Sequence, residues 1–192
     1  MGKLVVSEFV TVDGVIEDPG GSEGFQHGGW AFKFARGEEG DKFKLDETLN
    51  ADAMLLGRVT YEGFAAAWPD RDDEAGFAEK MNSMPKRVVS STLKELTWNN
   101  SALVEGDLTD SVTKLKNEFD GGILVAGSAT LVQALVENDL VDELRLMVFP
   151  IVLGSGKRLF GELDGTKSFQ LVESRPVGDE GVVILTYQPK SA

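Results

Sequence analysis

Cysteine is absent from the sequence, and histidine occurs once, as His27 in a glycine-rich stretch. Without cysteine, disulfides, thiolate zinc sites and a cysteine nucleophile are excluded. One histidine cannot by itself build a metal site, and a loop histidine is most often solvated, so we expect no metal and no catalytic role for it. The lack of cysteine is typical of a reducing compartment, and we expect a cytoplasmic protein.

Long apolar runs and an excess of positive charge are also missing. No stretch approaches the roughly 20 apolar residues of a membrane-spanning helix, and the first apolar run is too short for a signal peptide. The 32 acidic residues outnumber the 19 basic ones, which gives a net charge of −13. We therefore expect neither a membrane nor a nucleic acid as partner. An anionic ligand would need a local positive patch, and the basic residues that cluster are Arg58, Lys86 with Arg87, and Lys157 with Arg158.

Apolar runs alternate with helical patterns along the 192 residues, of which 42% are hydrophobic. This length predicts a single domain over residues 1–192. The alternation predicts an α/β fold of three layers, with a mainly parallel sheet between helices and a C-terminal antiparallel hairpin at 168–175 and 181–188. The other expected strands include 3–12, 53–56, 86–91, 123–126 and 140–150, and a helix is expected at 108–119 with Thr109 or Asp110 as its N-cap.

The stretch 123–131 has the pattern around which the rest of the chain is organised. An apolar run, Ile123 to Ala126, meets Gly127-Ser128 and is followed by a helical pattern. A continuous apolar run is typical of a buried parallel strand, and glycine lets the backbone approach a ligand closely. The unpaired N–H groups at the start of the following helix attract phosphate groups.

Three predicted strands are followed by glycine, serine, threonine or arginine residues. Ligands of open α/β sheets bind at the carboxyl ends of the strands, where glycine admits backbone, hydroxyls form hydrogen bonds and arginine gives a bidentate fork. Together the three ends favour a nucleotide or dinucleotide site. The spaced-glycine dinucleotide fingerprint and the lysine-bearing phosphate loop are both absent. The three ends are Gly57-Arg58-Val59-Thr60, Ser90-Ser91-Thr92-Leu93 and Gly127-Ser128-Ala129-Thr130.

Read in order, these motifs and their neighbours resemble the dihydrofolate reductase superfamily over nearly the whole chain. The segment from Glu137 to Leu144 and the loop from Pro150 to Phe160 favour the branch related to the reductase domain of bacterial riboflavin biosynthesis. The motifs that carry the resemblance are Asp13-Gly-Val-Ile16, Leu55-Leu-Gly-Arg-Val-Thr-Tyr-Glu62, Lys86-Arg-Val-Val-Ser-Ser91, Val125-Ala-Gly-Ser-Ala-Thr-Leu131, Leu140-Val-Asp-Glu-Leu144 and Pro150-Ile-Val-Leu-Gly-Ser-Gly156.

The resemblance implies a dihydrofolate reductase-like fold, NADPH as cofactor, and a set of site residues. Asp13 would face the substrate heterocycle, and the loop containing Gly154 and Gly156 would close over it. The family often has Gly-Gly where this chain has Gly127-Ser128, which weakens the case for a cis peptide there. The implied cofactor-binding residues are Gly57, Arg58, Thr60, Arg87, Ser90, Ser91, Gly127, Ser128, Ala129 and Thr130.

Folate reductases hold the pterin with a carboxylate from the helix before the Gly-Arg strand. By this resemblance Asp41 is the expected catalytic residue, with Asp46 and Glu47 as competitors. The alternative for Asp41 is a charge that favours the helix N-terminus.

The expected function is NADPH-dependent hydride transfer to a small pterin- or pyrimidine-like heterocycle. One alternative is a nucleotide- or ligand-binding protein without turnover, because fold alone does not establish catalysis. Another is riboflavin biosynthesis proper, the reduction of 5-amino-6-(5-phosphoribosylamino)uracil, for whose phosphate only Lys157 and Arg158 are available. The resemblance also implies a homodimer, to which the apolar strand Leu144 to Phe149 and the closing hairpin could contribute.

Overall fold

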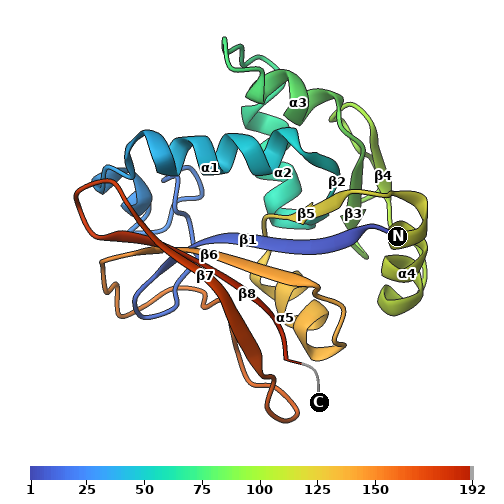
Figure 1. Ribbon diagram of the computed structural model, residues 1–192. Helices are drawn as coiled ribbons and strands as arrows, with labels where there is room; N and C mark the ends of the chain where they lie inside the picture. Colours follow the sequence, from blue (N-terminus) through green and yellow to red (C-terminus); the bar gives the residue numbers. More distant parts are fainter. Residues whose placement is uncertain (191–192) are drawn as a thin grey trace.

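The computed structural model describes residues 1–190, which form one eight-stranded sheet with helices on both faces (Figure 1). The strands lie in the order β4-β3-β2-β5-β1-β6-β8-β7. They are β1 (Lys3–Thr11), β2 (Ala51–Gly57), β3 (Lys86–Val89), β4 (Ser101–Leu103), β5 (Gly122–Val125), β6 (Glu143–Phe149), β7 (Phe169–Val177) and β8 (Val182–Pro189). The helices are η1 (Trp30–Lys33, a 3-10 helix), α1 (Gly37–Leu49), α2 (Arg58–Ala67), α3 (Phe77–Ser83), α4 (Leu108–Glu118) and α5 (Ala129–Glu137).

The six strands from β4 to β6 are parallel, whereas β8 and β7 close the sheet as antiparallel strands. This arrangement confirms the predicted fold class and the C-terminal hairpin. Strand β1 lies in the middle, with Val6 paired to Val125 of β5 on one side and to Leu144 of β6 on the other. The carboxyl ends of the parallel strands therefore share one edge, which is where ligands bind in such sheets.

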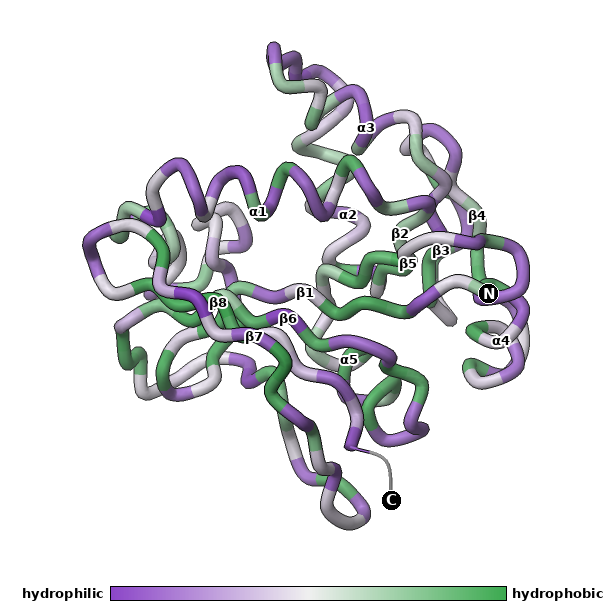
Figure 2. The backbone as a smooth tube through the Cα atoms, viewed as in Figure 1, coloured by the Kyte–Doolittle hydropathy of each residue, from purple (hydrophilic) through white to green (hydrophobic). Residues whose placement is uncertain are grey.

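Side-chain alternation along β1 divides the core between the two faces of the sheet. Leu4 and Val6 pack in a cluster with residues of α4 and α5, such as Val112 and Leu135. Val5 packs on the other face, with residues of α2 and α3. Figure 2 shows hydrophobic stretches in β5, in part of β1 and in α5. A third cluster joins η1 to β6, β7 and β8.

Some local expectations differ from the structure. The N-cap of α4 is Asp107, whose side chain accepts from the backbone N–H groups of Thr109 and Asp110, so neither of the two predicted residues caps this helix. Helix α1 begins at Gly37, so Glu38 and Glu39 supply the negative charge of its first turn and Asp41 lies beyond that turn. No helix within residues 1–190 is long and apolar enough to cross a membrane.

Candidate functional site at the carboxyl edge of the sheet

The turns after β2 and β5 lie against each other at this edge. The backbone N–H of Gly57 donates to the carbonyl oxygen of Gly127 at 3.2 Å. A Cβ on Gly57 would lie 2.3 Å from Ser128 Oγ, and one on Gly127 would lie 2.7 Å from Thr60 Oγ1. The peptide bond from Gly127 to Ser128 is cis, so the expectation drawn from the Gly-Ser pair is wrong. Gly127 also has φ of +92°, which other residues rarely adopt. The two turns, which we call the glycine corner (Gly57 and Gly127 with the residues that follow them), therefore need glycine at both positions.

Two helices begin at the glycine corner, α2 at Arg58 and α5 at Ala129. Among residues 1–190 no side chain caps either of them, because Gly57 has no side chain and Ser128 forms no cap hydrogen bond. Their first N–H groups, including that of Thr130, are thus left for a ligand, and both helix dipoles place partial positive charge there. The side chain of Arg58 is 47% exposed and pairs with Glu62 at 3.0 Å. The geometry suits phosphate groups.

The remaining predicted strand end, Ser90 to Leu93 after β3, is arranged differently. Ser90 Oγ accepts from the backbone N–H groups of Thr92 and Leu93, so this hydroxyl shapes a turn, while Ser91 is exposed. Arg87 points to α4, where it pairs with Glu118. Of the residues predicted to bind a cofactor, the structure thus gathers the first and third sets and leaves Arg87 engaged elsewhere.

Lys86 is also not part of a positive patch. Its side chain is fully buried, and Nζ donates to three backbone carbonyls at 2.9 to 3.0 Å, those of Asn82, Met84 and Asn99. It also lies over the ring of Trp98, 4.1 Å from the centroid. Burial lowers the pKa of Lys86 to about 8. Lys86 therefore ties β3 to its neighbouring loops, and of Arg58, Lys86 and Arg87 it is Arg58 that lies at the glycine corner.

Asp13 fastens the turn after β1 to the glycine loop 154–156. Its carboxylate accepts from Thr11 Oγ1 at 2.6 Å and from the backbone N–H groups of Leu153 and Gly154 at 3.2 and 2.8 Å. The Thr11 hydroxyl, and then these N–H groups, hold the pKa of Asp13 below its usual value. Gly156 has no room for a side chain, since a Cβ would lie 2.7 Å from a methyl of Val15. The predicted substrate-facing residues thus lie together, with the carboxylate oxygens of Asp13 already bonded within the chain.

Asp41 lies on the exposed side of α1, where its carboxylate pairs with Arg36 at 2.6 Å and the side chain is 66% exposed. Its competitor Asp46 is paired with Lys42, also at the surface. Only Glu47 turns toward the sheet, with a side chain 1% exposed. The structure therefore does not bring Asp41 together with the glycine corner.

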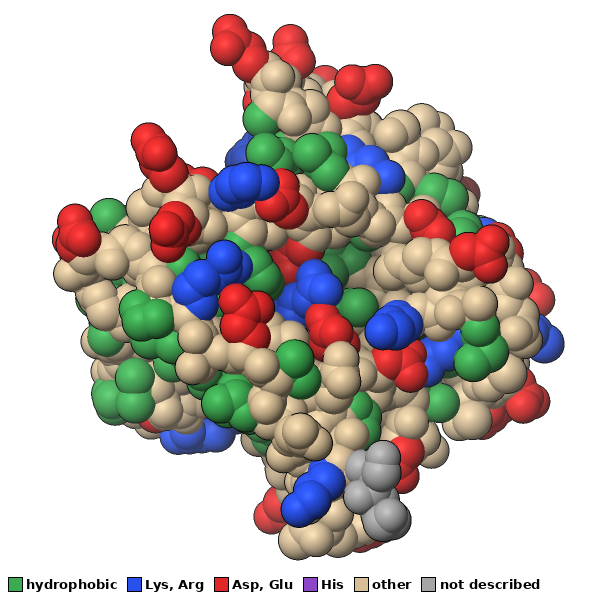
Figure 3. Space-filling view, viewed as in Figure 1, with side chains coloured by type: hydrophobic (Ala, Val, Ile, Leu, Met, Phe, Trp, Pro, Cys, Tyr) green, Lys and Arg blue, Asp and Glu red, His purple; other side chains and the backbone are tan. Residues whose placement is uncertain are grey.

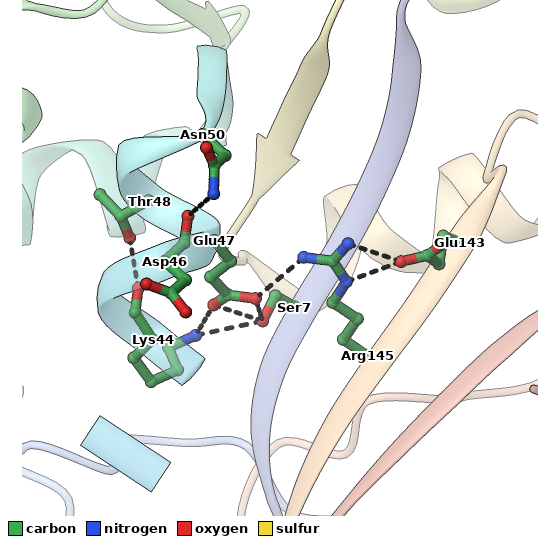
Figure 4. A network of polar contacts seen from close by, with 8 residues as sticks. All are labelled: Ser7, Lys44, Asp46, Glu47, Thr48, Asn50, Glu143 and Arg145. Carbon is green, nitrogen blue, oxygen red and sulfur yellow. Dashed lines mark hydrogen bonds and ion pairs between the residues drawn. The ribbon is translucent and has the colours of Figure 1, made fainter. Parts of the chain in front are cut away.

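Glu47 is the centre of a polar network between α1 and the middle of the sheet (Figure 4). Ser7 of β1 donates its hydroxyl to both carboxylate oxygens, at 2.8 and 2.9 Å. Lys44 contacts the same carboxylate, and Arg145 of β6 approaches it at 3.5 Å while pairing with Glu143 at 2.7 Å. Figure 3 shows basic and acidic side chains side by side on this face, below α1.

Phe9 continues this surface on β1, two residues beyond Ser7. Lys44 Nζ and Arg36 Cζ lie 5.0 and 5.1 Å from its ring centroid. An aromatic ring bracketed by two cations offers a flat apolar surface with nearby hydrogen-bond donors, which suits a polar heterocycle.

Glu8 is a further candidate residue, which sequence reasoning did not indicate. It lies on β1 between Ser7 and Phe9, is only 9% exposed, and its Oε1 has no hydrogen-bond partner within residues 1–190. Burial raises its pKa to about 8, against smaller lowering effects of the Lys44 ammonium and the Gly127 N–H. The available signal was a carboxylate within an apolar strand, followed by further apolar residues.

The family model described as the RibD C-terminal domain matches residues 2–183 of the chain. The uncharacterized protein YyaP of Bacillus subtilis (strain 168) is 28% identical over 188 residues, covering 96% of this chain and 94% of that protein. A crystal structure of a putative riboflavin biosynthesis protein from Shewanella sp. PV-4 matches with a TM-score of 0.78 at 26% identity, covering 98% of this chain and 99% of that one. Dihydrofolate reductase from Enterococcus faecalis, complexed with NADP(H), matches with a TM-score of 0.61 at 14% identity, covering 98% and 97% of the two chains. That last likeness is one of fold alone.

Proposed function

The chain belongs to the RibD C-terminal domain family, and from this premise we propose that it is an NADPH-dependent reductase acting on a small pterin- or pyrimidine-like heterocycle. Membership of the family and the dihydrofolate reductase-like fold confirm the resemblance carried by the sequence motifs. The observation that supports the cofactor is the glycine corner, where two uncapped helix N-termini and Arg58 converge at the edge where α/β sheets bind their ligands.

The residues at the corner fit a dinucleotide. Gly57 and Gly127 let the two turns pack against each other, which brings the N-termini of α2 and α5 to one place, and Arg58 supplies a half-exposed positive charge. In the proposed complex these groups hold the phosphates, and Thr60 and Ser128 offer hydroxyls beside them. Bound NADPH would supply the hydride, so the chain's own task is to orient the two rings and to exclude water.

For the substrate we propose the surface formed by Phe9, Lys44 and Arg36 beneath α1. The ring of Phe9 would lie against the heterocycle. Lys44 and Arg36 would select heterocycles by where their ring oxygens and nitrogens lie. Asp41 is the proposed carboxylate for the ring N–H groups, a role that requires its ion pair with Arg36 to open. The hydrogen bond from the Gly154 N–H to the Asp13 carboxylate would hold the glycine loop beside this surface.

Calorimetric titration with NADPH and NADH tests the cofactor assignment. We expect micromolar affinity for NADPH, weaker affinity for NADH, and a loss of about tenfold or more for NADPH in Arg58→Ala, because a charge-assisted phosphate contact is removed. Lys114→Ala, which removes an exposed cation from α4, is the matched control and should bind as the unaltered protein does. A chain that binds neither nucleotide would refute the cofactor assignment.

The second candidate is a nucleotide-binding protein without turnover. It is favoured by the state of the two predicted carboxylates, since Asp13 is bonded to the glycine loop and Asp41 is paired with Arg36. Screening pterins and pyrimidines for oxidation of bound NADPH separates the two functions. Turnover that falls in Asp41→Asn while nucleotide affinity is retained would assign the catalytic role to Asp41.

A further inference from the structure

Glu8 lies directly beside the glycine corner. In the parallel pairing of β1 with β5, Val6 is opposite Val125, so the next residue of β1 on the same face, Glu8, is level with Gly127. Its Oε1 lies 3.8 Å from the position that a Cβ of Gly127 would take, and Thr60 of α2 lies on the same glycine. This oxygen is buried and has no hydrogen-bond partner within residues 1–190.

A buried carboxyl with an unpartnered oxygen is costly in its charged form, so burial and the groups around Glu8 decide its protonation state. From α1, Lys44 favours ionisation and Glu47 opposes it, and the Gly127 N–H from the glycine corner favours it. Arg145 of β6 is already engaged by Glu47 and Glu143. Neither α2 nor α5 has an acidic residue in its first turn. Burial outweighs the favourable contacts and keeps the carboxyl neutral at pH 7.

We propose that Glu8 is a positioning residue that makes nucleotide binding pH-dependent: the neutral carboxyl beside Gly127 leaves the phosphate site positive, and the ionised form repels the phosphates. The proposal rests on the proposed function of the same corner. Its physical basis is that a buried negative charge beside a phosphate site acts in a medium that screens it weakly. Deprotonation also cancels part of the positive potential of the two helix N-termini.

The test is the affinity for NADP+ between pH 6.5 and 9.5, measured by calorimetry for the unaltered protein, Glu8→Gln and Glu79→Gln. Glutamine keeps the shape and stays neutral, so we expect its affinity to hold while that of the unaltered protein falls by about tenfold above pH 8. The ratio of the two cancels the titration of the nucleotide and of Lys86. Glu79 is an exposed glutamate on α3, and its variant should follow the unaltered protein.

A constant ratio between the unaltered protein and Glu8→Gln across this range would overturn the role of Glu8 and leave the proposed function standing. Absence of binding in all three proteins at every pH would instead refute the proposed function. These two failures are therefore distinguishable.

A second measurement needs no variant, so it tests the proposal even if the Glu8→Gln protein fails to fold. The side-chain carboxyl of Glu8 in the isotope-labelled protein can be titrated by NMR with and without NADP+. If the nucleotide prefers the neutral form, linkage requires the pKa of Glu8 to rise in the complex. An unchanged or lowered pKa would overturn the proposal.

Discussion

Glu8 also affects folding stability, with a sign that follows from its protonation in the two states. Burial raises its pKa from 4.5 to about 8 in the folded protein, so the folded state keeps a proton that the unfolded state has lost between these pH values. Stability is therefore highest below pH 4.5 with respect to this group and is lost as pH rises toward 8, by about 1.4 kcal/mol per pH unit. Above pH 8 both states are ionised and the loss is complete.

We predict that Glu8→Gln removes this loss. In urea unfolding at pH 5, 6, 7 and 8, the free energy of unfolding of the variant should gain on that of the unaltered protein by up to about 1.4 kcal/mol per pH unit, and by less near pH 5 and pH 8. Other titrating groups, such as Glu23 and Lys86, are present in both proteins and cancel in the difference. Glu79→Gln serves as the control for replacing a glutamate. Parallel curves for the unaltered protein and Glu8→Gln would show that Glu8 ionises normally.

Single residues also mark the limit of what the sequence could tell. The glycines at 57 and 127 were predicted to let the backbone approach a ligand, which stays a prediction, whereas the structure gives glycine a different reason there, the close contact with Ser128 and Thr60. The contacts that a long side chain makes in the fold were not predictable in the same way. Lys86 and Arg87 are adjacent and basic, yet one is buried under backbone carbonyls and the other pairs with α4. Their directions depend on which neighbours the fold supplies.

The elements were more predictable than their ends. Continuous apolar runs revealed the central strands, because both faces of these strands are covered by helices. The ends of α1 and α4 depend on single side-chain contacts with backbone N–H groups, and several acidic residues compete for such positions. At α4 the competing residues Thr109 and Asp110 both donate their N–H groups to Asp107.

The cap of α4 gives a prediction at this scale. Replacing Asp107 with alanine leaves two N–H groups without their acceptor and removes a negative charge from the positive end of the helix. We expect a loss of about 1 kcal/mol in the free energy of unfolding, measured by urea denaturation. Thr109→Ala is the matched control, because the Thr109 side chain does not cap the helix, and it should cost no more than a few tenths of that amount. Equal losses in the two variants would contradict the assignment of Asp107.

At the scale of the whole molecule, the two edges of the sheet differ. Strand β4 has only three residues, whereas β7 has nine and exposes Leu171 and Val172, at 48% and 55%. An edge strand with exposed apolar residues is prone to pair with another chain. Near it, an apolar groove of about 300 Å³ is lined by side chains that include Leu144, Leu146 and Phe160.

The exposed edge of β7 and the nearby groove agree with the homodimer that the family resemblance implies. The homodimer itself stays a prediction. We expect light scattering after size exclusion to give twice the 20.8 kDa mass of one chain at micromolar concentration. Val172→Lys places a charge on the edge of β7 and should shift the protein toward the monomer, because burying an unpaired ammonium opposes association. Val12→Lys, which alters an exposed valine just beyond β1, is the matched control and should leave the dimer intact. A monomeric mass for the unaltered protein would refute the dimer, and a dimeric Val172→Lys would place its interface away from β7.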